Sequence, residues 1–367
     1  MRVLRFLTAG ESHGVSVCAL LEGLPPGLEL DVEYINSRLK LRQRGHGRGA
    51  RQAIEDDAVE ITSGMRKGRT TGAPVLLVVC NRDSRIDETP EITVPRPGHA
   101  DLAGHVKYGV GIREVLERAS ARDTAARVAA GAVAQLLLKR VGCTVHGRVT
   151  AIGDVEADIA PACSTSDFDG ADASLVRCPD KKASEAMQKA IDAAREAGDT
   201  LGGIFEVAAF NVPTGLGSHV EWDRRADAAI GQAMLSIPAV KGVEIGPAFT
   251  NARLPGSRVH DEIVIGGGGR LERPTNRAGG MEGGITNGQP VVVRCAMKPI
   301  PTLTKPLRSI DLATGREAPA ARERSDVTAV PAASVVGEAM LALVLADMLL
   351  ERNGNDRLPE KSRGGII

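Results

Sequence analysis

The segment from residue 332 to residue 350 is the most apolar part of the chain, and it limits the folds that the chain can adopt. It has the sequence AASVVGEAMLALVLADMLL, which only Glu338 and Asp347 interrupt. Its 19 residues barely span the hydrocarbon core of a bilayer, and a carboxylate there is costly. We therefore expect a helix over 332–351 that is buried in the protein core or at a subunit interface.

Composition excludes several classes of protein. Lys and Arg total 46 and Asp and Glu total 46, so the formal net charge is zero. Polybasic nucleic-acid-binding proteins need a surplus of positive charge, which this chain lacks. One Trp, two Tyr and five Phe are too few for a platform of stacked rings that binds single-stranded nucleic acid. With 42 Gly among 367 residues, we expect many tight turns and close approaches of backbone to a ligand.

Hydrophobic periodicity predicts a mixture of strands and helices. We expect strands near residues 2–8, 15–22, 58–62, 74–80, 203–210, 242–246 and 290–297. We expect helices near 31–41, 120–140, 181–197, 223–236 and 332–351, and a loop-rich segment over 81–110. The spacing lacks the regular βαβ repeat of a doubly wound sheet, so the predicted fold class is α+β. No linker separates two halves, and we predict one domain over residues 1–367.

The cysteines and the first residues indicate a cytoplasmic protein. The six Cys are scattered, with no C-x-x-C pair and no His/Cys cluster, which is typical of reduced, buried thiols and predicts no metal site. The apolar run after Met1 is too short for the core of a secretory signal. We therefore expect a cytoplasmic protein that binds neither a metal ion, nor nucleic acid, nor a membrane.

A glycine-framed turn carries a candidate pair of catalytic side chains. Residues 10–14 have the sequence GESHG, which formally matches G-x-S-x-G, the nucleophile motif of α/β-hydrolases. That motif requires a helix after the serine, but the next residues alternate like a strand and end at two prolines. A serine hydrolase therefore stays a minor alternative. The turn would in either case expose Ser12 and His13 to a cleft.

A basic loop follows the first predicted helix. It contains three glycines and the side chains of Arg42, Arg44, His46, Arg48 and Arg51. Arg binds phosphate or carboxylate with two parallel hydrogen bonds, and Gly lets backbone come close to a ligand. The loop is a candidate clamp for a small anion, with an RNA-binding segment and a solvated loop as the alternatives. One short basic loop in a neutral chain favours the clamp over RNA.

Two loops in the middle of the chain carry further candidates. His99 lies in a loop rich in Pro and Gly, where a lone His is more often structural than catalytic. Ser120 and Asp123 match the capping box that opens a helix. With Arg118 just before them, the helix N-terminus is a candidate anion site.

The last third of the chain offers three more segments. Residues 276–288 hold five Gly and two Asn, which suits a loop that lies against a flat or phosphorylated ligand. Residues 298–302 follow a predicted strand and offer a cation and a hydroxyl. Asp326 stands beside Arg324 just before the last helix, as an oriented acid or base or as an ordinary surface ion pair.

Taken together, these segments resemble the chorismate synthase family over nearly the whole chain. The blocks that carry the resemblance stand in family order, as GESHG at 10–14, RPGHAD at 96–101, SARDTAARVAAGA at 120–132, IPAVKGVEIG at 237–246, the glycine-rich loop at 276–288, KPIPT at 298–302 and RSDVTAVP at 324–331. A chance match of this many ordered blocks is very improbable.

The resemblance implies a lyase that converts 5-enolpyruvylshikimate 3-phosphate to chorismate and phosphate by a 1,4-anti-elimination. This is the last shared step toward the aromatic amino acids, and it needs reduced FMN although nothing is oxidised overall. The family fold is a β-α-β sandwich with antiparallel sheets, and members are usually homotetramers. NADPH is a further candidate ligand as the reductant of the flavin. The sequence leaves open whether this chain has that reductase activity.

The resemblance also assigns chemical roles to individual residues. His13 would protonate the leaving phosphate, and His99 would lie by the N1 region of the flavin. Asp326 would take the proton from flavin N5. Ser12 and Ser120 match serines thought to assist the proton relay.

Binding positions carry over in the same way. Arg42 and Arg48 match positions assigned to NADP or to the substrate clamp. Family members usually have Glu at the position of Asp123, and the shorter acid should still cap its helix. Pro238 stands where Asn or Gln is common, so a flavin contact there would come from a backbone carbonyl. The positions that match FMN contacts are Arg118, Ala119, Ser120, Pro238, Ala239, Gly283, Lys298, Pro299, Ile300, Pro301, Thr302 and Arg324.

Overall fold

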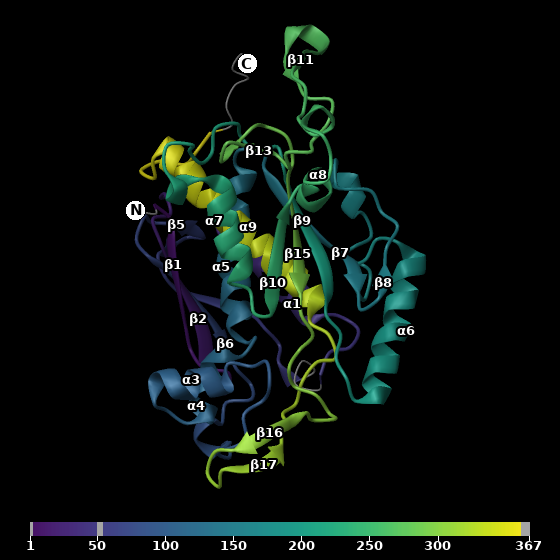
Figure 1. The fold of residues 1–367 in the computed structure, drawn as a ribbon. Coiled ribbons are helices and arrows are strands. Elements are labelled where there is room, and N and C mark those ends of the chain that lie inside the picture. The colour runs from purple at the N-terminus through teal and green to yellow at the C-terminus, as the bar shows by residue number, and fades with distance from the viewer. Residues whose placement is uncertain (1–2, 50–53, 361–367) are drawn as a thin grey trace.

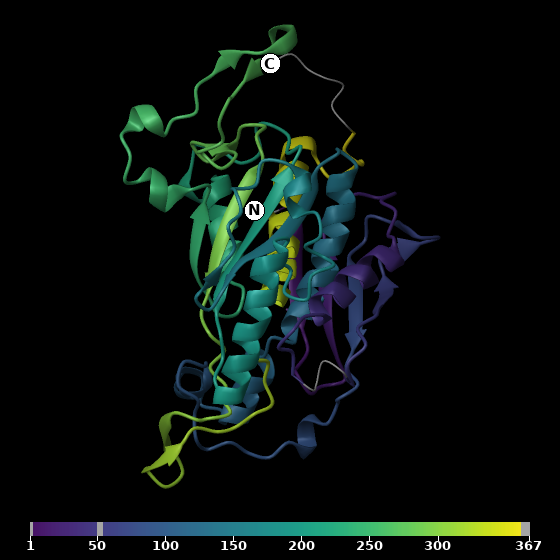
Figure 2. The ribbon, with the colours of Figure 1, turned by 90° about the vertical axis from the view of Figure 1, so that its right-hand side faces the viewer.

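The computed structural model describes residues 3–49 and 54–360. A layer of helices lies between two antiparallel sheets, which confirms the predicted α+β class and the β-α-β sandwich (Figure 2). Figure 1 shows the C-terminal helix, in yellow, passing between the two sheets. The largest cluster of buried apolar residues includes side chains from this helical layer and from the inner faces of both sheets.

The first sheet has four strands whose buried residues follow a period of two. In spatial order they are β1 (Arg5–Ala9), β2 (Ser16–Glu22), β6 (Val75–Cys80) and β3 (Val59–Ser63). Along β2, Val17, Ala19 and Leu21 are buried toward the helices, while alternate residues face outward. The outward residues include Leu7 of β1 and Leu20 of β2, which are exposed and directly paired across the two strands.

The second sheet is covered on both faces. In spatial order its strands are β10 (Val240–Ile245), β15 (Val291–Met297), β9 (Gly203–Phe210), β7 (Thr144–Ile152) and β8 (Val155–Glu156). Strand β9 is therefore almost continuously buried rather than alternating. On the face away from the helical layer, the rings of Phe168 and Phe210 pack edge to face with centroids 5.9 Å apart.

Four helices form the middle layer. They are α1 (Val32–Gln43), α5 (Asp123–Lys139), α7 (Ala226–Leu235) and α9 (Val330–Asn353). Helix α5 packs on β2 and β6, helix α9 packs on β7 and β9, and the two helices contact each other along their lengths. Small residues make this close approach possible, since a Cβ added at Gly131 of α5 would lie only 2.2 Å from the Cβ of Ala339 in α9.

The same substitution at two helical glycines should therefore change stability in opposite directions. We expect Gly131→Ala to lower the free energy of unfolding by about 1–3 kcal/mol, because α5 and α9 must move apart. Gly231 in α7 has no atom within 4 Å of an added Cβ, so Gly231→Ala should gain up to about 1 kcal/mol of helix propensity. Urea unfolding followed by circular dichroism measures both, and a stabilised Gly131→Ala protein would contradict the tight helix contact.

The two carboxylates of the apolar segment at 332–350 are paired inside the protein. Glu338 is 2% exposed, and Arg38 and Arg177 donate to its two oxygens. Asp347 Oδ1 accepts the main-chain N–H groups of Val3 and Leu4, each at 2.8 Å. Helix α9 is long and apolar enough to cross a membrane, but 94% of its most apolar 18-residue stretch is buried within the chain. The expected buried helix is thus confirmed, as a core helix.

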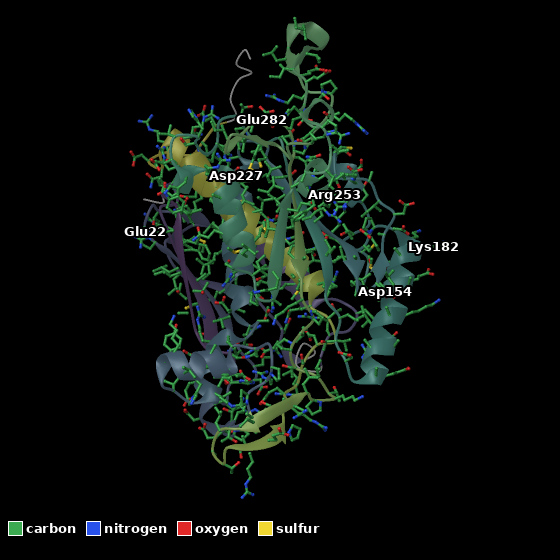
Figure 3. The ribbon with its side chains drawn as sticks, in the orientation of Figure 1. Glu22, Asp154, Lys182, Asp227, Arg253 and Glu282 are labelled. Atoms are coloured by element: carbon green, nitrogen blue, oxygen red, sulfur yellow. The ribbon has the colours of Figure 1, made fainter. Side chains whose placement is uncertain are left out.

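Smaller elements surround the sandwich. The helices among them are α3 (Asp101–Tyr108), α4 (Ile112–Ala119), α6 (Lys181–Ala197) and α8 (Ala248–Asn251). The short strands pair as β4 (Met65–Arg66) with β5 (Arg69–Thr70), β11 (Val264–Ile265) with β12 (Leu271–Glu272), β13 (Met281–Glu282) with β14 (Ile285–Thr286), and β16 (Arg308–Asp311) with β17 (Arg316–Pro319). Charged side chains such as those of Asp154 and Lys182 project outward from the periphery (Figure 3).

Most predicted elements are confirmed, and a few predictions are wrong. Helix α1 begins after Asp31, whose side chain accepts the N–H of Tyr34 at 2.9 Å, as expected of a cap. The loop-rich segment over 81–110 instead ends in α3, and α4 follows it. These two short helices pack on each other, so tertiary contact rather than local propensity stabilises them. Strand β7 was not predicted, because Arg148 interrupts its apolar pattern; that side chain is buried against Glu206.

The capping box at α5 is a further correction. Within the part of the chain that the structure describes, no side chain caps this helix, and Ser120 Oγ accepts from Ser12 and from the N–H of Arg122. Asp123 pairs instead with Arg118 at 3.0 Å and Arg127 at 2.8 Å, because these two cations flank it. The expectation of buried cysteines is also only partly met, since Cys80 and Cys163 are exposed.

Candidate active site

A cavity of about 390 Å³ lies where loops from both sheets meet the N-terminal ends of α5 and α9. This is the end of the sandwich that carries α3, α4 and the hairpin of β16 and β17 (Figure 1). The sequence-predicted residues that line it are Ser12, His13, Arg42, Arg48, His99, Ala119, Ser120, Pro238, Ala239, Lys298, Ile300, Pro301, Thr302, Arg324 and Asp326. Segments more than 300 positions apart thus share one cavity.

The turn between β1 and β2 presents Ser12 and His13. Asn81 holds this turn, because its Nδ2 donates to the main-chain carbonyls of residues 11, 12 and 14. Ser12 donates its hydroxyl hydrogen to Ser120 Oγ at 3.0 Å, which joins the two serines of the predicted relay. Strand β2 follows the turn directly, so the helix that a nucleophile elbow requires is replaced by a strand.

Both histidines of the cavity contact a buried carboxylate through Nδ1. His13 Nδ1 lies 2.8 Å from Glu117 Oε1, and His99 Nδ1 contacts Asp101 Oδ1. Asp101 also accepts from the main chain and guanidinium of Arg96, whose Nη1 donates to Thr302 Oγ1 at 2.9 Å. Burial raises the pKa of Asp101, but the hydrogen bonds from His99 and Arg96 outweigh it and hold the pKa far below its ordinary value.

A buried ion triad supports the basic side of the cavity. Asp57, with a fully buried side chain, lies 2.6 Å from Arg42 Nη2 and 2.6 Å from Arg122 Nη1. Arg122 Nε also donates to Asn81 Oδ1, so the triad is continuous with the turn that carries His13. Burial raises the pKa of Asp57, but the two guanidinium groups outweigh burial and lower that pKa below its ordinary value.

The lowered pKa of Asp57 predicts a pH dependence of stability. A carboxyl with a depressed folded-state pKa contributes stability above its unfolded pKa of about 3.9, and the contribution is lost as pH falls through the folded value. We expect Asp57→Asn to be destabilised by about 3–5 kcal/mol near pH 7, because two buried cations lose their partner. The difference from the parent should shrink below about pH 4.

Guanidinium denaturation between pH 3 and pH 8 checks this expectation. The matched control is Asp56→Asn, because Asp56 is the neighbouring residue but its side chain is 75% exposed. That variant should stay close to the parent at every pH, since exposed ion pairs contribute little. A difference between Asp57→Asn and the parent that stays constant down to pH 3 would contradict the assignment of Asp57 as an ionised core group.

Asp326 is held by the basic loop rather than by its sequence neighbour. Its Oδ2 lies 2.7 Å from Arg48 Nη1, and its Oδ1 accepts the main-chain N–H of Gly49 at 2.6 Å. Arg324 pairs instead with Asp83 at 2.7 Å. The surface pair between Arg324 and Asp326, one of the two sequence interpretations, is therefore absent among the described residues, and Asp326 pairs with a residue 278 positions away. Arg51, the last residue of the predicted clamp, lies outside the described residues.

Residues 237–239, 297–298 and 300–302 also line the cavity. Ala239 has a positive φ of 67°, which is uncommon for a residue with a side chain, and such conformations are concentrated at functional sites. Its carbonyl accepts the N–H of Lys298 at 2.9 Å, which ties this turn to the end of β15. Lys298 Nζ donates to the carbonyl of Gly98, beside His99.

Three predicted residues do not line the cavity. Arg118 instead contacts the end of β1, where it donates to the main-chain carbonyls of Thr8 and Gly10. Pro299 is flanked by two residues that do line the cavity. Gly283 lies in the turn between β13 and β14, at the opposite end of the sandwich from α3 and α4 (Figure 1). The assignment of these three residues to the cofactor stays a prediction.

The structure also brings in residues that sequence reasoning missed. They are Asp57, Asn81, Arg96, Asp101, Glu117 and Arg122, all of which are buried and contact a cavity side chain or its support. Arg96 and Asp101 stood inside the block around His99, so their spacing could have suggested a pair. Nothing in the local sequence links Glu117 to His13, which is 104 positions away.

The cavity combines cations with groups that can transfer protons. Arg42 Nε and Arg48 Nε are both buried without a hydrogen-bond partner among the described residues, although each residue lines the cavity. Such donors are suited to an anionic ligand. Among residues 3–49 and 54–360, no group of three or more His, Cys, Asp or Glu side chains could hold a metal ion. The fold and site are those of an enzyme whose cavity carries the side chains that anion binding and proton transfer require.

Comparisons with known proteins identify the family. A family model described as chorismate synthase matches residues 4–350. The chorismate synthase of Carboxydothermus hydrogenoformans is 50% identical over 373 residues, which cover 98% of this chain and 97% of that protein. The chorismate synthase of Aquifex aeolicus is 52% identical over 381 residues, with coverage of 98% and 96%. A solved structure described as the crystal structure of chorismate synthase matches with a TM-score of 0.80 and 46% identity, over 98% of this chain and 95% of that one.

The chain therefore belongs to the chorismate synthase family, as the sequence blocks predicted. Members of this family are carbon–oxygen lyases that depend on reduced FMN and act in aromatic amino acid biosynthesis. The match covers nearly the full length of both chains in each comparison, so the family resemblance is not confined to one segment.

Proposed function

We propose that this chain converts 5-enolpyruvylshikimate 3-phosphate to chorismate and phosphate in the cavity described above. The observation that carries the proposal is the convergence of Arg42, Arg48, His13, His99 and Asp326 on one cavity. The substrate carries a phosphate and two carboxylates, and FMN adds another phosphate. A chain with no net charge must concentrate its cations where these anions bind, and this cavity is lined by several of them.

The residues of the cavity fit both ligands. Burial lowers the pKa of Arg42, and the nearby Arg122 and Arg48 lower it further, although Asp57 opposes them. An anion beside these guanidinium groups would stabilise their charged forms and would occupy the two buried Nε donors. The backbone turn at Pro238 and Ala239 and the amine of Lys298 suit a flat, phosphorylated cofactor.

The family match and the lining of the cavity together support an assignment of residues to FMN. Those that line the cavity are Ala119, Ser120, Pro238, Ala239, Lys298, Ile300, Pro301, Thr302 and Arg324. When bound, reduced FMN supplies the reducing chemistry that the elimination needs, although the reaction has no net oxidation. Arg42 and Arg48 are assigned to the substrate, or to NADPH if the chain reduces its own flavin.

The chain's own residues then divide the proton transfers. His13 Nε2 gives a proton to the leaving phosphate, and the hydroxyls of Ser12 and Ser120 form a short relay beside it. His99, oriented by Asp101, would lie by the cofactor when it is bound. The carboxylate of Asp326, held by Arg48 and Gly49, would accept the proton that the family resemblance assigns to flavin N5.

An anaerobic assay of phosphate release tests this function. With 5-enolpyruvylshikimate 3-phosphate as substrate, we expect phosphate and chorismate only when dithionite-reduced FMN is present. Release of phosphate without flavin, or no release with it, would contradict the proposal. Replacing dithionite by NADPH with oxidised FMN tests in addition whether the chain reduces its own flavin.

A substitution of Lys298, which lines the cavity, tests whether the reaction takes place there. We expect Lys298→Met to lower kcat/KM by about tenfold or more, because a hydrogen bond to a charged group contributes about 1.5–3 kcal/mol. Lys182→Met on α6 is the matched control, since Lys182 is an exposed lysine on the outside of the sandwich (Figure 3). Equal activities of the two variants would place the reaction elsewhere.

The expected homotetramer and cytoplasmic location belong to the same proposal. The outer face of the four-stranded sheet supports self-association, because Leu7 and Leu20 are 65% and 38% exposed and lie side by side. Light scattering of the purified chain tests the oligomeric state, and a monomer at micromolar concentration would contradict it. We also expect that the basic loop does not bind RNA, even at low salt, where such binding would be strongest.

A further inference from the structure

Glu117 binds the turn that carries His13 through several contacts. Its Oε1 lies 2.8 Å from His13 Nδ1, and its Oε2 accepts the main-chain N–H of His13 at 2.7 Å. The main-chain carbonyl of Glu117 accepts the N–H of Ser12 at 2.9 Å. Both the ring and the backbone of His13 are therefore oriented by one residue near the end of α4.

Glu117 lies behind His13 as seen from the cavity. The Glu117 side chain is 3% exposed, whereas that of His13 is 12% exposed and lines the cavity, which Glu117 does not. Burial raises the pKa of Glu117, but hydrogen bonds from the ring and main chain of His13 outweigh burial and hold the pKa below its ordinary value. Both carboxylate oxygens of the buried Glu117 side chain thus contact His13.

We propose that Glu117 is the positioning residue of His13, which keeps the proton of the neutral ring on Nδ1 and assigns proton exchange with a ligand to Nε2. The proposal rests on the proposed function only for the role of His13 as the acid toward phosphate. A carboxylate accepts hydrogen bonds and donates none, so it stabilises the ring form in which Nδ1 is the donor. After the doubly protonated ring has given its Nε2 proton to a ligand, the remaining proton is on Nδ1, and this Nδ1–H donates a hydrogen bond to Glu117.

An amide at this position reverses the preference. In Glu117→Gln the side-chain oxygen can still accept the main-chain N–H of His13, and the amide NH2 then faces Nδ1. Nδ1 must become the acceptor, and the neutral ring carries its proton on Nε2. Proton donation from Nε2 of the doubly protonated ring would leave an Nδ1–H that faces an N–H donor, which is unfavourable.

Nitrogen NMR of ligand-free protein with 15N-labelled histidine measures the tautomer without any activity assay. The His13 signals are assigned by their loss in His13→Ala. We expect the neutral His13 ring to be protonated on Nδ1 in the parent and on Nε2 in Glu117→Gln. Glu114→Gln is the matched control, because Glu114 lies on the same helix, carries the same charge and is exposed. It should leave both the tautomer and the turnover unchanged.

Turnover provides the second readout. Glu117→Gln should lower kcat by about tenfold to a hundredfold. This range is taken from metal sites, where losing the carboxylate that orients a histidine has an effect of that size. In the His13→Ala background the same change should lower turnover by less than about twofold further, because Glu117 then has no ring to orient. If Glu117→Gln does not fold, Glu117→Asp takes its place and must retain the Nδ1–H form, since it keeps a carboxylate acceptor.

The outcomes separate this proposal from the proposed function. An unchanged His13 tautomer in Glu117→Gln overturns the positioning role, and so does an equal loss of turnover in both backgrounds. Loss of the Nδ1–H form in Glu117→Asp, with its carboxylate intact, overturns it as well. A swapped tautomer with parental turnover supports control of the tautomer by Glu117, and it removes His13 from its role as the acid.

Discussion

Replacing Asp326 by Asn is expected to lower turnover by at least about a hundredfold, the low end for loss of a positioned acid or base. A carboxylate can accept a proton during the reaction, whereas an amide of nearly the same size cannot. The amide oxygen can still accept the N–H of Gly49, but the contact with Arg48 Nη1 changes from an ion pair to a neutral contact. Some loss of binding through Arg48 is therefore expected in addition to the loss of turnover.

The comparison with Arg48→Met separates these two effects. Both variants break the ion pair between Arg48 and Asp326, but only Asp326→Asn removes the carboxylate. We expect Arg48→Met to act mainly on KM and Asp326→Asn mainly on kcat. Single-turnover kinetics with reduced FMN give the rate of the chemical step directly. A rate for Asp326→Asn within a few-fold of the parent would make Asp326 a mere ion-pair partner of the basic loop.

Removing the imidazole of His13 should lower turnover by a similar factor. We expect His13→Ala to reduce turnover by about a hundredfold or more, because the leaving phosphate loses its positioned proton donor. The truncation leaves Glu117 buried without the ring that it binds, so the cavity wall beside it becomes polar and open. Added imidazole could enter that space, and we expect it to restore part of the activity.

His105→Ala is the control for this substitution. The ring of His105 contacts the carbonyl of Val110 at the end of α3 and does not line the cavity. This variant should keep turnover within about twofold of the parent, as surface substitutions usually do. Equal deficits in His13→Ala and His105→Ala would argue against His13 as the acid. Parental activity of His13→Ala, with no effect of added imidazole, would argue against it as well.

Local sequence patterns predicted most of the elements that build the site. The strands that flank His13 and the helix that begins near Ser120 follow from periodicity, and the basic loop was identified by its Arg and Gly content. The ordered blocks then implied the family, which the comparisons confirm. Errors occurred where tertiary contact outweighs local preference, as at α3 and α4, which pack on each other, and at Asp123, which pairs with Arg118 and Arg127 rather than capping α5.

Partners across the cavity could not be predicted in this way. Glu117 meets His13 from 104 positions away, and Asp326 meets the N–H of Gly49 from 277 positions away. Arg324 was the nearer cation to Asp326 in sequence, yet it contacts Asp83. These choices depend on where the ends of two sheets and a helical layer come together, and no local pattern contains that information.

The sequence by itself determined most of the strands and helices, that the apolar segment at 332–350 must be buried, and where cations and histidines are concentrated. These properties depend on neighbours within a few turns or strand repeats, so periodicity and composition are sufficient to predict them. Only the tertiary structure decided the partners of the two carboxylates in that segment. Glu338 pairs with Arg38 and Arg177, and Asp347 accepts main-chain N–H groups just before β1. It likewise decided that Glu117 holds His13 and that Arg48 holds Asp326. The physical reason is that a buried charge is tolerated only with a partner at hydrogen-bond distance, and the packing of the layers selects that partner.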